Sequence, residues 1–413
     1  MKVKSLFLSM CAIAALASCS QNEDVVTPTG SNAPKAQVIL KLEGDGVAKS
    51  RAAGESEAAS EDGAAIKDVT VFFFNQTGFI VGAPQFLQAA ALQNPIATTT
   101  DAAKVVVIAN LGDKTGDGTF NGIASLSQLQ SLDFSSIGAA GSAPDITYTV
   151  NQSKDNLYSS GMGEITFNDN TGTATVQLHF VSARVKTVKI AWTANQHYAA
   201  SETELKADAD KWFTIKSVYM MTAQTNSPLI PANLTETTWG GFTPQTYAFA
   251  GGVSWGTAPW QWTGDNAPKQ TNDYLAVAED LVESTANANQ IDNALKTKSW
   301  YLFENSPAST HPTGLVIEVV WRSKEQSTDA NDLLTKYFTM YFGEAGANGT
   351  TQPLLTAGKT YDMALSLKGN FKPGGNAGGG GDDPTKPSVD ASVTVTVNNA
   401  AWTTTAEIVK DFQ

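Results

Sequence analysis

Three residue types that often carry chemistry or crosslinks are scarce in this sequence. The 413 residues include two cysteines, three histidines and three arginines. No two histidines are close in sequence, so their spacing predicts no metal site, and no paired carboxylates or nucleophile motif stand out. The sequence therefore predicts neither an enzyme nor a bound cofactor or metal.

Positive charge is also scarce. Lysine and arginine total 27 against 40 aspartate and glutamate residues, which gives a net charge of −13 at pH 7. A phosphate backbone would repel such a protein, so nucleic acid is not expected as a partner. With 42% hydrophobic residues the chain can form packed cores, and 413 residues predict two or three domains.

The first residues have the features of an export signal. Lys2 and Lys4 precede an apolar stretch, residues 6–17, that is too short to span a membrane. Leu16-Ala17-Ser18-Cys19 resembles the bacterial lipobox, in which cleavage leaves a lipid-bearing cysteine at the N-terminus. We predict a lipoprotein signal peptide over residues 1–18 and lipidation of Cys19. The alternative is an ordinary secretory signal with an incidental cysteine.

After the signal peptide, residues 20–34 are polar and predict a flexible tether, and strand-like segments follow it. Val38, Leu40 and Leu42 alternate with their neighbours and predict a first strand, followed by an exposed Ala-, Gly- and Glu-rich loop over residues 44–65. Ile66–Phe74 is rich in β-branched and aromatic residues and ends at a turn signal, which predicts a central strand.

A weak internal repeat organises the rest of the chain. Ile66–Phe74 is similar to Ile215–Met220, and Lys104–Asn110 is similar to Trp300–Asn305, in the same order. This order predicts two antiparallel β-sandwiches, over residues 52–182 and 183–372. Short helices are also predicted, and their apolar positions lie within residues 123–132, 275–282 and 291–295.

A strand pattern lies beyond a glycine-rich linker. Residues 373–387 contain six glycines between positions 374 and 381 and have a relaxed reach of ~20 Å. In residues 388–413, Val393, Val395 and Val397 alternate with threonine and predict a strand, after which a polar tail is expected. This strand either folds back onto its own second domain or is donated to a neighbouring molecule.

Each of the three arginines has a different expected exposure. Arg184 lies inside a strand pattern, Arg322 lies beside a polar loop, and Arg51 lies in the exposed stretch where proteolysis is easiest. A cut between Arg51 and Ala52 would separate the first strand from everything that follows. The alternative is that Arg51 is an ordinary solvated charge.

The order of these features resembles the FimA-type fimbrillins, the subunits of type V pili of anaerobic Gram-negative bacteria. The resemblance rests on the lipobox at Cys19, the 66–74 strand, and residues 105–112, 176–185, 301–306 and 393–402. It implies an all-β fold with minor helix: two tandem Greek-key, transthyretin-like sandwiches and a C-terminal donor strand.

The same resemblance implies a life cycle. The protein would be anchored in the outer membrane through its lipid, and an arginine-specific protease would remove a propeptide, residues 19–51. The C-terminal strand of the next subunit would then fill the place of the first strand and build a homopolymer, a surface fimbrium for cell adhesion. While tethered, the first strand outcompetes free subunits at micromolar concentration by ~10³, or ~4 kcal/mol, so the cut acts as a switch.

Two other segments bear on ligand binding, and only the first suggests a ligand. Trp255, Trp260 and Trp262 lie in a Gly-rich stretch, so a surface lipoprotein that binds a glycan or host receptor without polymerising is the alternative function. Tryptophans more often cover a core. A calcium-like loop at residues 113–118 lacks an acidic residue or Asn at its third position and has Ala124 where a bidentate Glu is needed. It therefore predicts no calcium site.

Overall fold

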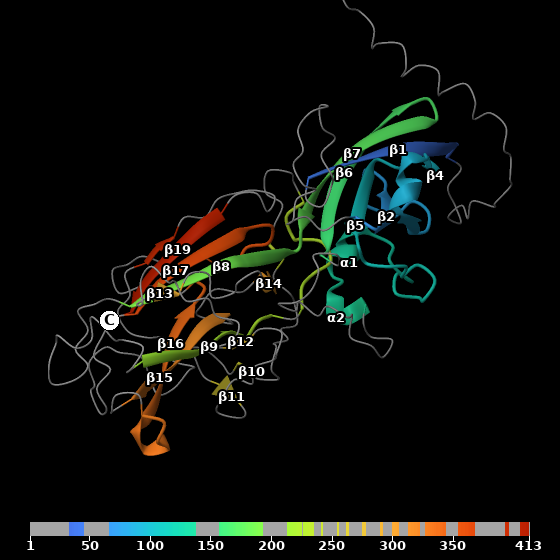
Figure 1. The fold of residues 1–413 in the computed structure, drawn as a ribbon. Helices are drawn as coiled ribbons and strands as arrows, with labels where there is room; N and C mark the ends of the chain where they lie inside the picture. The colour runs from blue at the N-terminus through green and yellow to red at the C-terminus, as the bar shows by residue number, and fades with distance from the viewer. Residues whose placement is uncertain are drawn as a thin grey trace, which may run out of the picture.

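The computed structural model describes residues 33–44, 66–137, 157–192, 213–224, 226–234, 241–242, 254–255, 262–263, 275–277, 290–291, 300–304, 313–322, 327–343, 354–367, 393–395 and 405–412. These residues form two β-rich lobes (Figure 1). The lobes meet where β7 (Thr171–Phe180) runs into β8 (Ser182–Trp192), with only Val181 between the two strands.

Seven strands form the sheet of the N-terminal lobe, in the order β3-β2-β5-β6-β7-β1-β4. Neighbouring strands are antiparallel except β1 and β7, which are parallel. Besides β7, the strands are β1 (Lys35–Gly44), β2 (Asp68–Phe74), β3 (Gln85–Gln88), β4 (Ile96–Thr99), β5 (Lys104–Ala109) and β6 (Ser159–Asn168).

The strand predicted over residues 66–74 is observed as β2, between β3 and β5. Its side chains are buried on both faces, because Val69, Val71 and Phe73 pack into one hydrophobic cluster while Phe72 and Phe74 pack into another. A strand with two buried faces is an almost continuous apolar run rather than an alternating one. That is why this segment is so clear in the sequence.

Two glycines let β6 cross closely over β7. A Cβ atom on Gly161 would overlap the carbonyl oxygen of Gln177, and one on Gly163 would overlap that of Thr175. The β6–β7 pairing is interrupted between Ser160 and Ile165, where these glycines lie. Glycine is required here because the backbones approach too closely for any side chain.

The C-terminal lobe contains two larger sheets, with strand orders β12-β9-β15-β16 and β13-β8-β17-β19-β18, and β14 also pairs with β8. A separate pair consists of β10 (Ser254–Trp255) and β11 (Trp262–Thr263). The other strands are β9 (Phe213–Met221), β12 (Leu275–Val277), β13 (Gln290–Ile291), β14 (Trp300–Phe303), β15 (Gly314–Arg322), β16 (Leu333–Tyr341), β17 (Thr360–Leu367), β18 (Val393–Val395) and β19 (Thr405–Phe412).

The two lobes share most of their strand order. The run β3-β2-β5-β6 corresponds to β12-β9-β15-β16, and β7-β1-β4 corresponds to β17-β8-β14. The similar segments Ile66–Phe74 and Ile215–Met220 occupy equivalent positions. The match of Lys104–Asn110 with Trp300–Asn305 was wrong, because β5 pairs with β2 whereas β14 pairs with β8. Any buried strand that ends in asparagine gives this local pattern, so the pattern does not show which strands are its neighbours in the sheet.

Helices are few and short. They are α1 (Leu126–Gln130), α2 (Phe134–Ile137), and 3-10 turns at Ala89–Gln93 and Ala330–Asp332. The helix expected within residues 123–132 is α1, and the Ser125 side chain caps it by accepting a hydrogen bond from Gln128 N. The helices expected at 275–282 and 291–295 were wrong for the described residues, since 275–277 and 290–291 form β12 and β13. These short apolar runs form strands because β12 pairs with the open edge of β9 and β13 pairs with β8. Their periodicity alone does not distinguish a helix from a strand.

A packed junction joins the lobes. The Phe134 ring of α2 stacks on Phe303 of β14, and the backbone N–H of Phe134 donates to the Ser227 carbonyl oxygen, 3.0 Å away. Beside it, the buried Asp133 carboxylate accepts a 2.8 Å hydrogen bond from Asn226 Nδ2. The largest hydrophobic cluster runs through this junction into both lobes.

The fold is nearly all-β, as predicted. The strands up to β7 pair among themselves, and those from β8 onward do the same, within the residues that the structure describes. The Greek-key, transthyretin-like form of the lobes and the exact domain boundaries stay predictions.

Candidate functional site: the slot of the first strand

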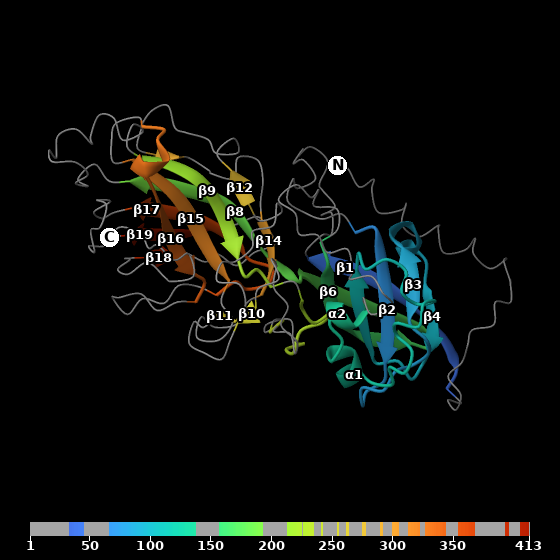
Figure 2. The ribbon, with the colours of Figure 1, turned by 90° about the horizontal axis from the view of Figure 1, so that it is seen from below.

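The first strand, β1, is inserted into the N-terminal sheet between β7 and β4 (Figures 1 and 2). Residues 37–44 pair in parallel with residues 171–178 of β7. Residues 35–38 pair antiparallel with residues 96–99 of β4. We call the position that β1 fills, between β7 and β4, the β1 slot.

Alternate side chains of β1 enter the core. Val38 is fully buried, Leu40 is 7% exposed, and Leu42 is partly buried against the same cluster. Ile39, between them, is 48% exposed. The alternation arises because successive side chains of a strand point to opposite faces. It places the removable-strand residues predicted from the sequence, Val38, Leu40 and Leu42, on one face.

The neighbours of these side chains form the floor of the β1 slot. Val38 lies beside Ile96 of β4 in the antiparallel register, and Leu42 lies beside Val176 of β7 in the parallel register. Ile96 and Val176 are both buried and belong to the same hydrophobic cluster as Val38. An empty slot would expose them, at a cost of ~25 cal/mol per Å² of apolar surface.

Both ends of β1 are fixed as well. Gln37 N donates to the Asn170 carbonyl oxygen at 2.9 Å, and Thr100 N donates to Pro34 O at 3.0 Å. At the other end Gly44 has a φ of +90°, and a Cβ there would overlap the Leu178 carbonyl oxygen. Glycine is needed at this position for both its conformation and its closeness to β7.

The outer wall of the slot, β4, depends on β1. In the sheet β4 has β1 as its only strand neighbour among the described residues. Gln85 Nε2 of β3 also donates a 2.8 Å hydrogen bond to the Ala97 carbonyl oxygen of β4. Removal of β1 would therefore leave β4 without a strand neighbour among the described residues.

Several of the predicted processing residues lie outside the described residues. These are Cys19, Arg51 and Ala52. Arg184 is described and is 4% exposed in β8, so its expected position inside a buried strand is confirmed. Its guanidinium lies 5.9 Å from the centroid of the Tyr301 ring.

The C-terminal strand pairs within the chain. Val393 and Val395 lie in β18, which runs antiparallel to β19, and β19 runs parallel to β17. Val397 lies outside the described residues. Of the two arrangements that the sequence left open, the structure shows the one in which the strand adds to its own C-terminal lobe.

β19 was not predicted from the sequence. The polar tail expected after Trp402 was wrong for residues 405–412, which form a strand beside β17 over its whole length. The adjacent β-branched residues Ile408 and Val409 are the signal that could have indicated it. Lys410 and Asp411 obscured that signal, because they break the apolar alternation.

A hydrogen-bonded tyrosine fixes the turn before β17. The Tyr361 hydroxyl donates to the Leu354 carbonyl oxygen at 2.6 Å and accepts from Thr356 N at 2.8 Å. Burial raises the pKa of Tyr361 to about 12. In the same turn, Ala357 N donates to Glu304 Oε2, and burial raises the pKa of that carboxyl above its usual range. These groups support the turn on which β17 and β19 depend.

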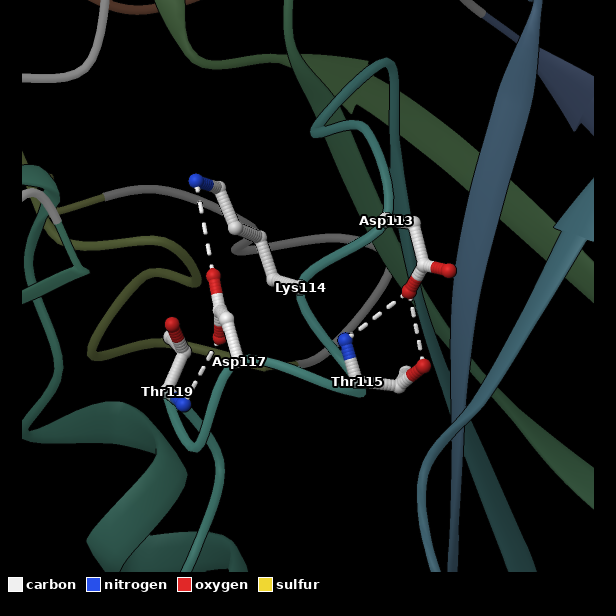
Figure 3. Close-up of polar contacts among 5 residues, drawn as sticks. All are labelled: Asp113, Lys114, Thr115, Asp117 and Thr119. Carbon is white, nitrogen blue, oxygen red and sulfur yellow. Dashed lines mark hydrogen bonds and ion pairs between the residues drawn. The ribbon is translucent and has the colours of Figure 1, made fainter.

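The acidic loop at residues 113–118 binds its own backbone (Figure 3). Asp113 Oδ1 accepts hydrogen bonds from Thr115 N and Oγ1, and Asp117 Oδ1 accepts one from Thr119 N. The hydrogen bonds from Thr119 are the main cause of the lowered pKa of Asp117. No group of three or more possible metal ligands occurs among the described residues.

The tryptophan segment is only partly described. Trp255 and Trp262 are directly opposite each other in the β10–β11 pair, and Trp260 lies outside the described residues. Glycan binding by this segment stays a prediction. Within the described part of the chain, no helix has the length and apolar character needed to cross a membrane.

The fold and the slot define a β-rich structural protein whose sheet depends on its first strand. Residues 36–180 match the family model of the major fimbrial subunit protein FimA, and residues 244–402 match that of the C-terminal domain of FimA-like major fimbrial subunit proteins. The chain belongs to the FimA-type fimbrillin family. It is therefore a subunit of a cell-surface fimbrium.

Several solved structures are similar to this chain at low sequence identity. A candidate cell adhesion protein from Bacteroides eggerthii is 20% identical with a TM-score of 0.50, and the match covers 93% of this chain and 100% of that one. A candidate cell adhesion protein from Parabacteroides distasonis is 18% identical (TM-score 0.45; coverage 92% and 96%). A fimbrilin from Porphyromonas gingivalis is 14% identical (TM-score 0.46; coverage 91% and 96%). No curated protein matches the sequence.

Proposed function

We propose that this subunit is exported as an outer-membrane lipoprotein, cleaved after Arg51, and polymerised by strand exchange. Cys19 carries the lipid, and an arginine-specific protease separates Arg51 from Ala52. β1 then leaves its slot, and the C-terminal strand of another copy takes its place by adding a strand to the sheet.

The observation that carries this proposal is the position of β1. It is paired on both sides, and Val38 and Leu40 complete a core whose other members lie in the rest of the N-terminal lobe. Only the segment 45–65 joins β1 covalently to that lobe. A single cut in that segment turns an integral strand into one that another strand can replace.

The C-terminal segment has the pattern that the slot requires. Val393, Val395 and Val397 have the i, i+2, i+4 spacing of the apolar face of β1. Each of these valines would contribute ~1.5–3 kcal/mol on full burial. Each backbone hydrogen bond from the incoming strand to β7 or β4 would contribute ~1 kcal/mol net. Because β18 pairs with β19 in its own lobe, exchange requires β18 to leave that partner first.

The test is polymerisation of two altered chains. We expect detergent-resistant oligomers from the unaltered protein in the presence of an arginine-specific protease, and none from Arg51→Lys or from a chain truncated after Pro387. Arg51→Lys keeps the positive charge and removes the cleavage site. Arg322→Lys is the matched control and should polymerise.

N-terminal sequencing provides a second readout. The proposal requires Ala52 at the N-terminus of polymerised subunits and Cys19 at that of membrane-bound precursors. Normal polymerisation of both the Arg51→Lys chain and the truncated chain would show that assembly uses another mechanism.

A further inference from the structure

The cleavage site lies outside β1 and leaves the strand intact. β1 ends at Gly44, and Arg51 follows seven residues later. Among the described residues, β1 pairs with β7 and β4, and both of these strands lie on the other side of the cut. Cleavage after Arg51 therefore removes the covalent connection of β1 to the lobe and none of these pairings.

The pairings of β1 oppose its spontaneous departure. Eight parallel pairs and four antiparallel pairs hold it, and Val38 and Leu40 lie in the core. A strand that leaves unassisted exposes the buried side chains of Ile96 and Val176 and deprives β4 of its strand neighbour. An incoming strand that displaces β1 stepwise replaces each pairing as it is lost, so displacement has a much lower barrier than dissociation.

The fragment that contains β1 also contains the predicted lipid site. Fifteen residues, 20–34, separate Cys19 from β1, and they span at most ~50 Å when extended. A subunit cut after Arg51 thus stays connected to Cys19 for as long as β1 remains in its slot. Within the described residues, the fragment is then linked to the lobe by the non-covalent pairing of β1.

We propose that β1 acts after cleavage as a non-covalent membrane tether, and that a cut subunit leaves the membrane only when the C-terminal strand of another copy displaces β1. Release is thereby coupled to incorporation into the polymer. Cleavage makes the subunit competent for assembly without freeing it. This inference rests on the proposed function, since it assigns a regulatory step to the same slot.

The test uses the mature chain beginning at Cys19, which is its only cysteine. The Cys19 thiol is biotinylated in place of the lipid, and the protein is captured on streptavidin at low density. An arginine-specific protease then cuts the chain, and intact mass confirms the cut after Arg51. The fraction of the body, from Ala52 onward, that stays on the support is measured over time. A synthetic peptide of residues 388–413 is then added.

Two variants and a control test whether β1 holds the cut body on the support. Asn32→Arg adds a cleavage site before β1, between residue 32 and Ala33, so the body should be released as soon as it is cut, although β1 can stay in its slot. Val38→Asp should release the body at least about tenfold faster than the unaltered chain. Ile39→Asp, on the exposed face of the same strand, should retain it. If Val38→Asp does not fold, the Asn32→Arg comparison decides alone.

The expected result is retention of the unaltered body after cleavage and its release by the peptide. Immediate release on cleavage overturns the tether while leaving strand exchange intact if the released body still polymerises. Retention without release by the peptide overturns the coupling. If cut chains fail to polymerise in either case, the proposed function fails together with the tether. The two failures are thus distinguished by the polymerisation assay.

Discussion

Phe134 and Phe303 stack across the junction of the two lobes, with ring centroids 5.3 Å apart and ring planes at 25°. Both rings are almost fully buried, and Phe134 also contacts Tyr158 of its own lobe at a centroid distance of 4.7 Å. The lobes therefore share a continuous core at this point. Such a junction resists bending between the lobes.

Truncation of this stacked ring should destabilise the protein. Phe134→Ala removes a buried aromatic side chain and leaves a cavity at the junction, at a cost of about 3–5 kcal/mol. Urea denaturation measures the change in the free energy of unfolding. Phe79→Ala is the control, because Phe79 is 60% exposed, and its effect should stay within about 0.5 kcal/mol. Equal effects of the two substitutions would contradict a packed junction.

The two faces of β1 should respond differently to substitution in the uncut chain. Leu40→Ala deletes buried methyl groups from the core and should cost about 2–5 kcal/mol. Ile39→Thr keeps a β-branched residue on the exposed face and should cost less than about 1 kcal/mol. Thermal unfolding compares the two variants. A larger loss from Ile39→Thr would mean that β1 lies in the opposite register.

The Tyr361 hydroxyl should stabilise the turn before β17. Tyr361→Phe removes both of its hydrogen bonds and leaves Thr356 N without this acceptor, at a cost of about 1–3 kcal/mol near neutral pH. Because the pKa of Tyr361 is raised to about 12 from 10.0, its contribution is complete below pH 10 and is lost as the pH rises through about 12.

Unfolding free energies measured between pH 8 and pH 12 test this. The difference between the unaltered chain and Tyr361→Phe should shrink above pH 10. A constant difference across this range would show that the hydroxyl titrates alike in the folded and unfolded states.

The partly buried Glu304 carboxyl should favour folding at acidic pH. Its pKa is raised, chiefly by burial, so the folded state holds this proton more tightly than the unfolded state does. Its contribution to stability is therefore fully present below the usual pKa near 4.5 and is lost as the pH rises through the higher folded value.

Glu304→Gln keeps an acceptor for Ala357 N and removes the charge. We expect the stability of this variant relative to the unaltered chain to be higher at pH 7 than near pH 4. Denaturant titrations at the two pH values measure the difference. A relative stability that is lower at pH 7 than near pH 4 would show that the charged form is the favoured one.

Much of the β structure could be predicted because the deciding signals are local. β2 is a run of β-branched and aromatic residues with two buried faces, and β1 alternates as a strand with one buried face does. The short apolar runs of β12 and β13 could not be assigned, because the open edges of β9 and β8 made them strands. Likewise the edge of β17 decided that residues 405–412 form β19.

The sequence by itself determined which residues of the first strand are apolar, where an arginine follows it, and that a valine-alternating segment lies near the C-terminus. Only the tertiary structure decided that β1 lies between β7 and β4 and that β18 pairs with β19. The physical reason is that strand pairing joins segments distant in the chain. A period of two residues fixes the face that a strand buries, while its neighbours depend on which sheet edges are open to it.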